Sequence, residues 1–252
     1  MNYGYACINM TLSEVPKSKR ITTNRSMIKR TFKEKGIKYA SELALQNVKD
    51  LIKILAWNEE NNIRFYRMSS DIFPWCSEYN YWELPDYMEI KYWLCYAGDY
   101  AKEWDHRLTF HPGPFCCLAS PNFEVVKKTY KELNNHSRIF DMMGFEPSHY
   151  NKINIHVGGT YGDKDKTAKR FIENFLRPGG LDENTKKRFT LENDDKASMW
   201  STKDIYDKIH HETGIPIVFD YHHHRFCTGG LTEQEALELA GSTWPPWIKP
   251  VV

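Results

Sequence analysis

The sequence has little that would set it apart from ordinary globular proteins. None of its six cysteines forms a CxxC pair, which excludes the usual structural zinc motifs and a small disulfide-stapled scaffold. No run of 18 apolar residues predicts a membrane span. The first twenty residues also lack the basic start and apolar run of a secretory signal. These absences indicate an intracellular protein with reduced, mostly buried thiols.

Charge of one sign is not in excess either. The formal net charge is +1, which does not by itself indicate a nucleic-acid-binding protein. Charge is unevenly distributed, however, because residues 1–38 carry nine Lys and Arg side chains against Glu14 and Glu34. Such a cluster is either a surface that attracts phosphates or a solvated loop and helix face, and the composition does not decide between them.

A strand and helix alternation does run along the chain. Its 252 residues match the size of one α/β barrel. We expect strands at residues 3–9, 63–69, 107–111, 152–157, 188–192, 216–221 and 250–252. Apolar spacing predicts helices at residues 41–61, at 123–143 with Gly144 as a C-cap, at 167–175 and at 202–213. The alternation predicts parallel βαβ units in a single domain over residues 1–252.

The seventh predicted strand coincides with the last residues of the sequence. A closed barrel needs an eighth strand with its helices, so either the sheet is open or the sequence is truncated.

Side chains that can hold a metal follow four successive predicted strands. His111 ends the third, His156 lies on the fourth, Glu192 ends the fifth, and residues 220–224 (Asp-Tyr-His-His-His) end the sixth. The carboxyl ends of barrel strands meet at one face, where imidazole and carboxylate groups suit divalent Mn, Zn or Fe. A single His at a strand end is more often structural. Packing alone, however, does not explain well why candidate ligands occur at the ends of four successive strands. We therefore predict a metal site, with His111, His156 and Glu192 as the catalytic residues.

At these positions the sequence resembles the UV damage endonuclease family. The resemblance covers nearly the whole chain and lies in long strings in the right order. These strings are Gly-Tyr at 4–5, Ile-Thr-Thr-Asn-Arg at 21–25, Asn-Val at 47–48, Trp-Asn-Glu at 57–59, Arg-Phe-Tyr-Arg-Met-Ser-Ser at 64–70, Phe-Pro-Trp at 73–75, His-Pro-Gly at 111–113, Ile-His-Val-Gly-Gly at 155–159, Tyr-Gly-Asp-Lys at 161–164, Leu-Glu-Asn-Asp-Asp-Lys at 191–196 and Phe-Asp-Tyr-His-His at 219–223.

The resemblance implies a TIM (β/α)8-like barrel that lacks its last strand or strands. It implies an enzyme that uses up to three divalent ions, usually manganese, to cut double-stranded DNA 5′ to UV photoproducts and related lesions. We expect the protein to act as a monomer. The residues that fall on family metal ligands are His111, His156, Glu192, Asp220 and His223. Glu78 stands where a further His is expected, and a carboxylate can also ligate a metal there.

The resemblance also implies a set of DNA contacts. Tyr5 and Asn9 fall on residues that line the lesion-side pocket, and we expect Arg25 and Lys196 to hold phosphates. Phe115 stands where the family has an aromatic residue that probes the duplex, and it can wedge into a base stack.

Two departures from the family pattern bear on function. Pro114 replaces a Gln and cannot hydrogen-bond a base edge. The family continues past strand seven with further His, Lys and Glu residues, of which the next His would be residue 253. We therefore expect this chain to be truncated at strand seven.

Three functions stay open on the sequence. The first is the repair endonuclease, and the second is a truncated form that binds damaged DNA without cutting it. The third is an abasic-site nuclease or a sugar-phosphate isomerase on a related metal barrel. The strings at residues 191–196 and 220–223 favour the repair endonuclease.

Overall fold

The computed structural model describes residues 3–250 of the chain. The chain divides into two compact units, each made of two segments. The first unit comprises residues 1–111 and 135–147, and the second comprises residues 112–134 and 148–252. Two of the three crossings between units fall at residues 111/112 and 147/148, outside any helix or strand.

Three parallel strands form the centre of the first unit. They are β1 (Gly4–Ala6), β2 (Phe65–Met68) and β3 (Arg107–Phe110), and each pairs with the next in chain order. All four residues of β3 are buried, which is typical of a strand in a parallel sheet covered on both faces.

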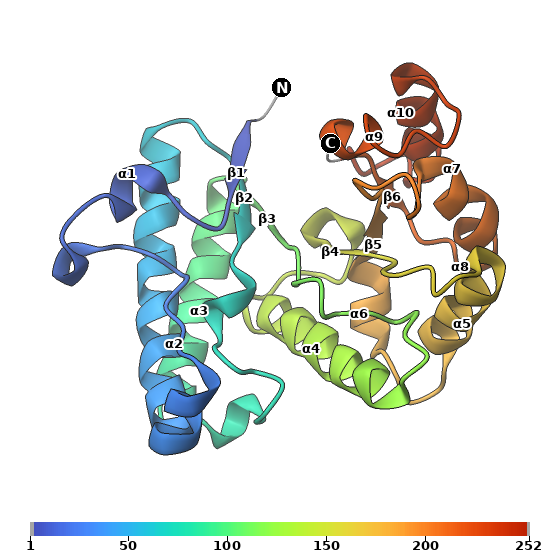
Figure 1. Cartoon of the computed structure of the whole chain (residues 1–252). Coiled ribbons are helices and arrows are strands. Elements are labelled where there is room, and N and C mark those ends of the chain that lie inside the picture. Colours follow the sequence, from blue (N-terminus) through green and yellow to red (C-terminus); the bar gives the residue numbers. More distant parts are fainter. Residues whose placement is uncertain (1–2, 251–252) are drawn as a thin grey trace. The chain divides into compact units, whose positions relative to one another are not determined.

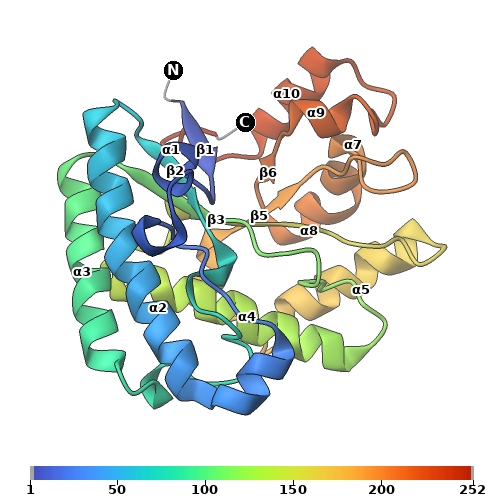
Figure 2. The same ribbon diagram turned by 60° about the vertical axis from the view of Figure 1, so that its left-hand side comes forward.

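Two long helices follow the first two strands. The helix α2 (Lys29–Glu60) lies beside α3 (Tyr87–Glu103), as Figures 1 and 2 both show. A stripe of fully buried residues on α2 faces the core and includes Val48, Leu51 and Leu55. The unit also contains the shorter elements α1 (Met10–Ser13), η1 (Lys17–Lys19), η2 (Ser70–Ile72) and η3 (Tyr81–Glu83).

The second unit repeats this arrangement with three further parallel strands. They are β4 (Ile153–His156), β5 (Phe189–Glu192) and β6 (Ile217–Val218), again paired in chain order. The register sets His156 opposite Glu192, and Glu192 opposite Val218. The ends of β4 and β5 therefore lie at the same level.

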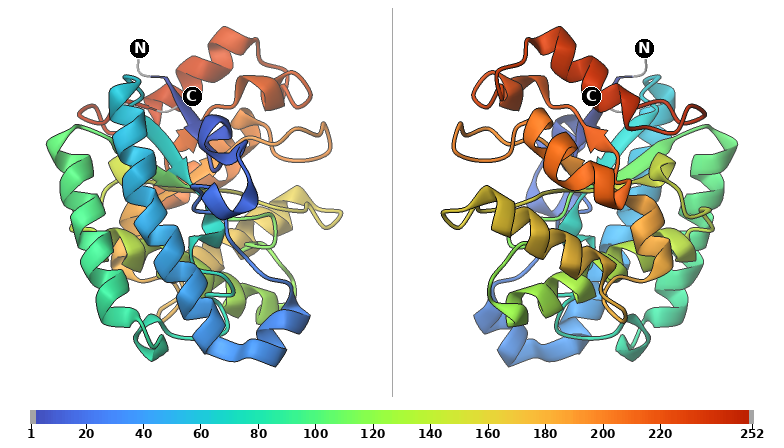
Figure 3. Two further views of the ribbon diagram at one scale, coloured as in Figure 1. Left: turned by 90° about the vertical axis from the view of Figure 1, so that its left-hand side faces the viewer. Right: turned by 90° about the vertical axis from the view of Figure 1, so that its right-hand side faces the viewer.

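Helices of the second unit are shorter than α2 and α3 of the first. They are η4 (His149–Asn151), α5 (Lys164–Leu176), α6 (Glu183–Arg188), α7 (Thr202–Ile205), η5 (Tyr206–His210), α8 (His211–Thr213), α9 (Tyr221–His224) and α10 (Glu233–Ser242). The side views in Figure 3 show α5 next to the η5–α8 segment, and α10 lies against α7 and β6. The predicted helix at 202–213 is confirmed as one helical run with a π-helical turn in its middle.

The helix α4 (Phe123–Met142) is shared by both units, because the boundary between them falls at residues 134/135. Gly144 ends this helix with φ +72°, and its amide donates to the Asp141 carbonyl at 3.0 Å. The amide of Phe145 donates to the Phe140 carbonyl at 3.1 Å. This pair of hydrogen bonds is a Schellman motif, which confirms the predicted glycine cap.

The predicted alternation of strands and helices is confirmed for the six strands above, although each is shorter than predicted. The helix expected at residues 41–61 begins earlier, at Lys29, and has a kink at Gly36. Half of residues 29–40 are charged and they carry no apolar stripe, so their helical start could not be recognised. Most of the strand expected at 250–252 lies outside the described residues.

No helix in the described part of the chain has both the length and the apolar character needed to cross a bilayer.

Candidate metal centre

Four side chains of the second unit gather where its strands end. His156 and Glu192 are the last residues of β4 and β5, and Nε2 of His156 lies 3.7 Å from Oε1 of Glu192. Asp220 follows β6 and caps α9, because its Oδ1 accepts a hydrogen bond from the His223 amide at 2.9 Å. This cap turns His223 toward Glu192, with Nδ1 of His223 3.5 Å from Oε1.

The group formed by Glu192, Asp220 and His223 has the geometry of a cation site. Each residue offers one ligand atom, and these atoms lie within 4.8 Å of one another. Two carboxylates and an imidazole suit divalent transition metals. Nδ1 of His223 donates to the Asn193 carbonyl at 2.9 Å, which leaves the lone pair for a metal on Nε2. The ring of His156 lies beside that of His223, with 5.4 Å between the centroids.

Buried amides hold these ligands in place. The side chain of Asn193 accepts from the Asp220 amide at 2.8 Å and donates to the Asp220 carbonyl at 3.0 Å. The side chain of Asn154 donates to Oε2 of Glu192 and accepts from the Thr190 hydroxyl at 2.9 Å. The Glu192 carboxylate is thus oriented by Oε2, while Oε1 faces the two histidines.

Asp194 adds a further carboxylate to this group. Its Oδ1 lies 3.4 Å from Nδ1 of His156, and the amide of Trp200 donates to its Oδ2 at 3.4 Å. Burial raises the pKa of Asp194 to about 6, and the neighbouring Asp195 and Glu192 carboxylates add to the increase. A buried concentration of acidic groups of this kind is one that a bound cation stabilises.

Two predicted metal ligands belong to the first unit. His111 directly follows β3 and is half-buried, and its carbonyl accepts a hydrogen bond from the Ser70 hydroxyl at 3.0 Å. Glu78 is exposed in the turn after Pro74, and its amide donates to the Trp75 carbonyl at 2.9 Å. Their role as ligands stays a prediction.

Tyr5 and Asn9, which are predicted to line a lesion pocket, hydrogen-bond each other. The Tyr5 hydroxyl donates to Oδ1 of Asn58 at 2.6 Å and accepts from Nδ2 of Asn9 at 2.9 Å. Burial is the largest effect on Tyr5 and raises its pKa. Asn9 is 4% exposed and caps α1 by accepting from the Leu12 amide. In this structure both side chains form hydrogen bonds that hold residues 5–12 in place within the first unit.

Arg25, which is predicted to hold a phosphate, makes intramolecular contacts. Its guanidinium pairs with the buried Asp50 carboxylate at 2.7 Å. It also donates to the carbonyls of Thr22, at 2.6 Å, and Arg20, at 2.7 Å. These contacts tie residues 20–25 to α2, which is a structural role that the sequence alone did not show.

The other two predicted DNA contacts lie in loops of the second unit. Phe115 is 88% exposed in the turn after the His-Pro-Gly string. Lys196 is exposed between β5 and α7. Both are therefore accessible to a ligand.

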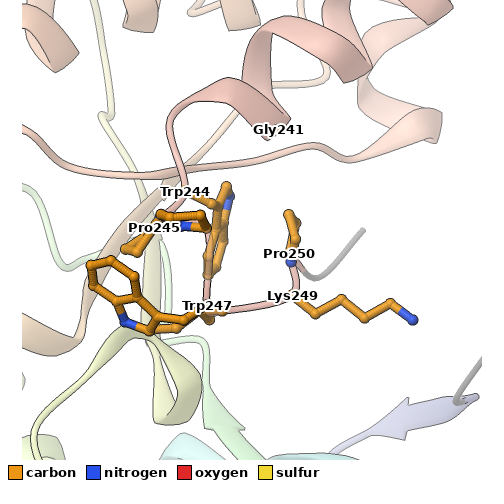
Figure 4. A pocket seen from close by; sticks show the side chains of 8 residues that line it. Gly241, Trp244, Pro245, Trp247, Lys249 and Pro250 are labelled. Atoms are coloured by element: carbon orange, nitrogen blue, oxygen red, sulfur yellow. The ribbon is translucent and has the colours of Figure 1, made fainter.

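A hollow near the end of the described chain differs from the metal-ligand group in the residues that line it. Figure 4 shows the eight residues that line it, none of which is acidic. Trp244 packs with Val218 and Ile248, and its indole donates to the Ile217 carbonyl at 2.7 Å. Trp247 is 81% exposed beside it.

The sequence reasoning missed three residues of the centre: Asn154, Asn193 and Asp194. A signal was present for two of them, because Asn154 lies two residues before His156 and Asp194 two residues after Glu192. Alternation in extended chain directs residues two apart to the same side. Asn193 points the other way and gave no such signal.

Comparison with known proteins finds one family and several relatives of similar sequence. The family model described as UV-endonuclease UvdE matches residues 1–250. A UV-damage endonuclease of Neurospora crassa is 37% identical over 225 residues, which cover 84% of this chain and 33% of the relative. A UV DNA damage endonuclease of Bacillus cereus strain G9842 is 34% identical over 254 residues, which cover 98% of this chain and 74% of the relative.

Solved structures match as well. The crystal structure of SacUVDE has a TM-score of 0.83 and 32% sequence identity, and the match covers 100% of this chain and 84% of that one. A D-psicose 3-epimerase from Clostridium cellulolyticum H10 has a TM-score of 0.54 at 12% identity, covering 76% of this chain and 64% of the other, so this likeness concerns the fold alone.

The fold and the acidic, histidine-containing group define a TIM-like α/β barrel protein with a candidate metal centre. Since the family model matches nearly the whole chain, the protein belongs to the UV-endonuclease UvdE family. The predicted fold class and the predicted family are both confirmed. The chain spans about a third of the length of the fungal relatives that it matches.

Proposed function

We propose that this chain is a DNA-repair endonuclease that incises the backbone 5′ to UV photoproducts and related lesions with bound divalent metal. The observation that carries the proposal is the convergence of Glu192, Asp220 and His223, with His156 beside them, at strand ends in a member of this family. Its substrate is double-stranded DNA. It acts as a monomer inside the cell, where this substrate is found.

The donor set fits manganese or a similar ion. Glu192, Asp220 and His223 would hold one ion, with His156 as a further ligand. His111 at the end of β3 and Glu78 are the additional ligands that a centre of up to three ions would use. Bound ions would supply an activated water and neutralise charge on the phosphodiester.

The chain's own residues orient these groups and hold the substrate. Asn154 and Asn193 fix the ligands, which removes the need for them to reorganise when the metal binds. Phe115 would wedge beside the damaged base, and Lys196 would contact a phosphate. Tyr5 and Asn9 would line the lesion pocket. We assign Arg25 a supporting role, since its guanidinium binds Asp50.

The substitution Glu192→Gln tests the proposal. It keeps the size of a side chain that is 6% exposed but removes its charge, so Mn²⁺ binding should weaken and incision of a UV-irradiated duplex should fall by about a hundredfold or more. The assay uses an end-labelled duplex with Mn²⁺ and records the position of the cut. The control is Glu183→Gln, an exposed carboxylate on α6 before β5, which should incise like the wild type.

Two results would contradict the proposal. Full incision by the Glu192→Gln protein would show that the group does not hold the reacting metal. Wild-type protein that binds irradiated duplex with Mn²⁺ but never cuts it would instead identify a binding protein without nuclease activity.

A further inference from the structure

We propose that the outer face of α9 and of the turn that follows it, made of His222, Arg225 and Phe226, contacts the DNA strand beside the candidate metal centre, with Arg225 on a phosphate and Phe226 on a sugar or base. This inference rests on the proposed function and adds to it a strand-binding surface. The three residues are exposed, with Phe226 55% exposed. Their spacing of i, i+3 and i+4 places them on one side of a helical turn.

The short α9 directs its three consecutive histidines differently. His224 is 3% exposed and packs against Phe219, with 5.2 Å between the ring centroids. His223 faces Glu192 in the acidic group. His222 lies on the outer side, where its ring meets that of Phe226 edge-on at 5.2 Å. The outer face is therefore one residue away from a candidate metal ligand.

The position of this face is fixed by hydrogen bonds. Asp220 caps the start of α9, and the Phe226 amide donates to the His223 carbonyl at 3.0 Å. The Cys227 amide donates to the same carbonyl at 3.1 Å. These bonds fix the backbone that carries the three side chains.

Arg225 carries an exposed guanidinium directly after α9. Among the described residues, no carboxylate forms an ion pair with it. Lysines elsewhere in the second unit differ, since Lys164 pairs with Asp204 at 2.8 Å and Lys203 with Asp207 at 2.6 Å. An exposed guanidinium is suited to a phosphate, which it can bind with two parallel hydrogen bonds.

The combination of groups favours a nucleic-acid strand over other ligands. Each strand of a DNA duplex repeats a phosphate followed by a sugar and a base, and a cation next to an aromatic ring can contact these groups in turn. Such a strand must pass close to the acidic group if its backbone is to be cut there. Phe226 and Arg225 offer both contacts within two adjacent residues.

Duplex binding by the Arg225→Ala and Phe226→Ala proteins tests the inference. Fluorescence anisotropy with an irradiated duplex at several salt concentrations should show about fivefold weaker binding for Arg225→Ala, with the salt slope reduced by about one. Phe226→Ala should weaken binding about fivefold or more with an unchanged slope. Arg225→Lys should retain the slope. Calorimetric titration with Mn²⁺ alone should give the wild-type affinity in all three.

The controls remove an exposed cation and an exposed apolar side chain at the opposite end of the strands. Lys187 on α6 precedes β5, and Leu176 is 51% exposed at the end of α5. Lys187→Ala and Leu176→Ala should bind duplex like the wild type. If Arg225→Ala matches Lys187→Ala in affinity and slope while the wild type still incises, this inference is wrong and the proposed function stands. If the wild type neither binds nor incises duplex, both are wrong.

Discussion

Asn193 cannot act as an acid or a base, yet its hydrogen bonds orient two residues of the candidate metal centre. It is fully buried, and its side chain holds the backbone of Asp220 on the neighbouring strand end through two hydrogen bonds. Its own carbonyl accepts the proton of His223 Nδ1. One residue thus fixes the positions of two candidate ligands.

Asn193→Ala should lower Mn²⁺ affinity by about 10- to 100-fold, the usual effect of removing a group that orients a ligand. Calorimetric titration measures this. The matched control is Asn174→Ala, because Asn174 is also buried and donates to a main-chain carbonyl, that of Leu118, away from the centre. Both variants should lose about 1–3 kcal/mol of unfolding free energy, but only the first should lose metal affinity. Equal metal affinity in the two variants would contradict the role of Asn193.

For single residues, the sequence predicts which side chains can carry out chemistry better than it predicts which side chains contact each other. The strand-end positions of His156, Glu192 and His223 followed from the pattern of residue types. The pairing of Arg25 with Asp50 did not, because it joins residues 25 apart and depends on how the loop folds onto α2. The position of Arg25 in a basic segment therefore gave no indication that its guanidinium pairs with a carboxylate of the same protein.

Among the elements, α4 shows what one glycine contributes. Gly144 ends the helix with φ +72°, a conformation that residues with a Cβ adopt at a cost. A Cβ there would meet only the flexible end of Lys102, at 3.1 Å, so the cost comes from the backbone.

Gly144→Ala should therefore lower the free energy of unfolding by about 1 kcal/mol, measured by urea denaturation. Gly241→Ala is the control, because Gly241 lies inside α10 and an added Cβ meets nothing within 4 Å. That substitution should raise the stability by about 0.5–1 kcal/mol. The opposite order of the two variants would contradict the assigned conformations.

The elements also show where periodicity fails. The helix α2 was found from its stripe, but α3 was not, because apolar residues surround it on several sides. Met88 is 74% exposed and Tyr92 63% exposed, although Ile90 and Leu94 are completely buried. A helix with apolar residues on both faces gives no clean 3.6-residue signal.

For the whole molecule, acid stability should depend on His149. Burial lowers the pKa of His149 from 6.5 to about 4. The unfolded chain therefore binds this proton more readily than the folded one. The resulting stability is complete above pH 6.5 and is lost as the pH falls toward 4, with an upper limit of roughly 3 kcal/mol.

His149→Gln should reduce the loss of stability between pH 6.5 and 4 relative to wild type, followed by urea denaturation across that range. The exposed His211 provides the control, and His211→Gln should show the wild-type dependence. Identical pH dependence in the His149 variant would show that this residue does not limit acid stability.

Because α4 belongs partly to each unit, it affects how fragments of this protein can be expressed. Residues 1–111 lack the later part of α4, which supplies Phe140 beside Phe110, with 5.0 Å between the centroids. They also lack Asn135, whose side chain donates to the Cys76 carbonyl at 2.7 Å. A fragment cut at residue 111 would expose the apolar surface that these residues cover. Because each unit is made of two separate segments, neither is encoded by one uninterrupted stretch of the gene.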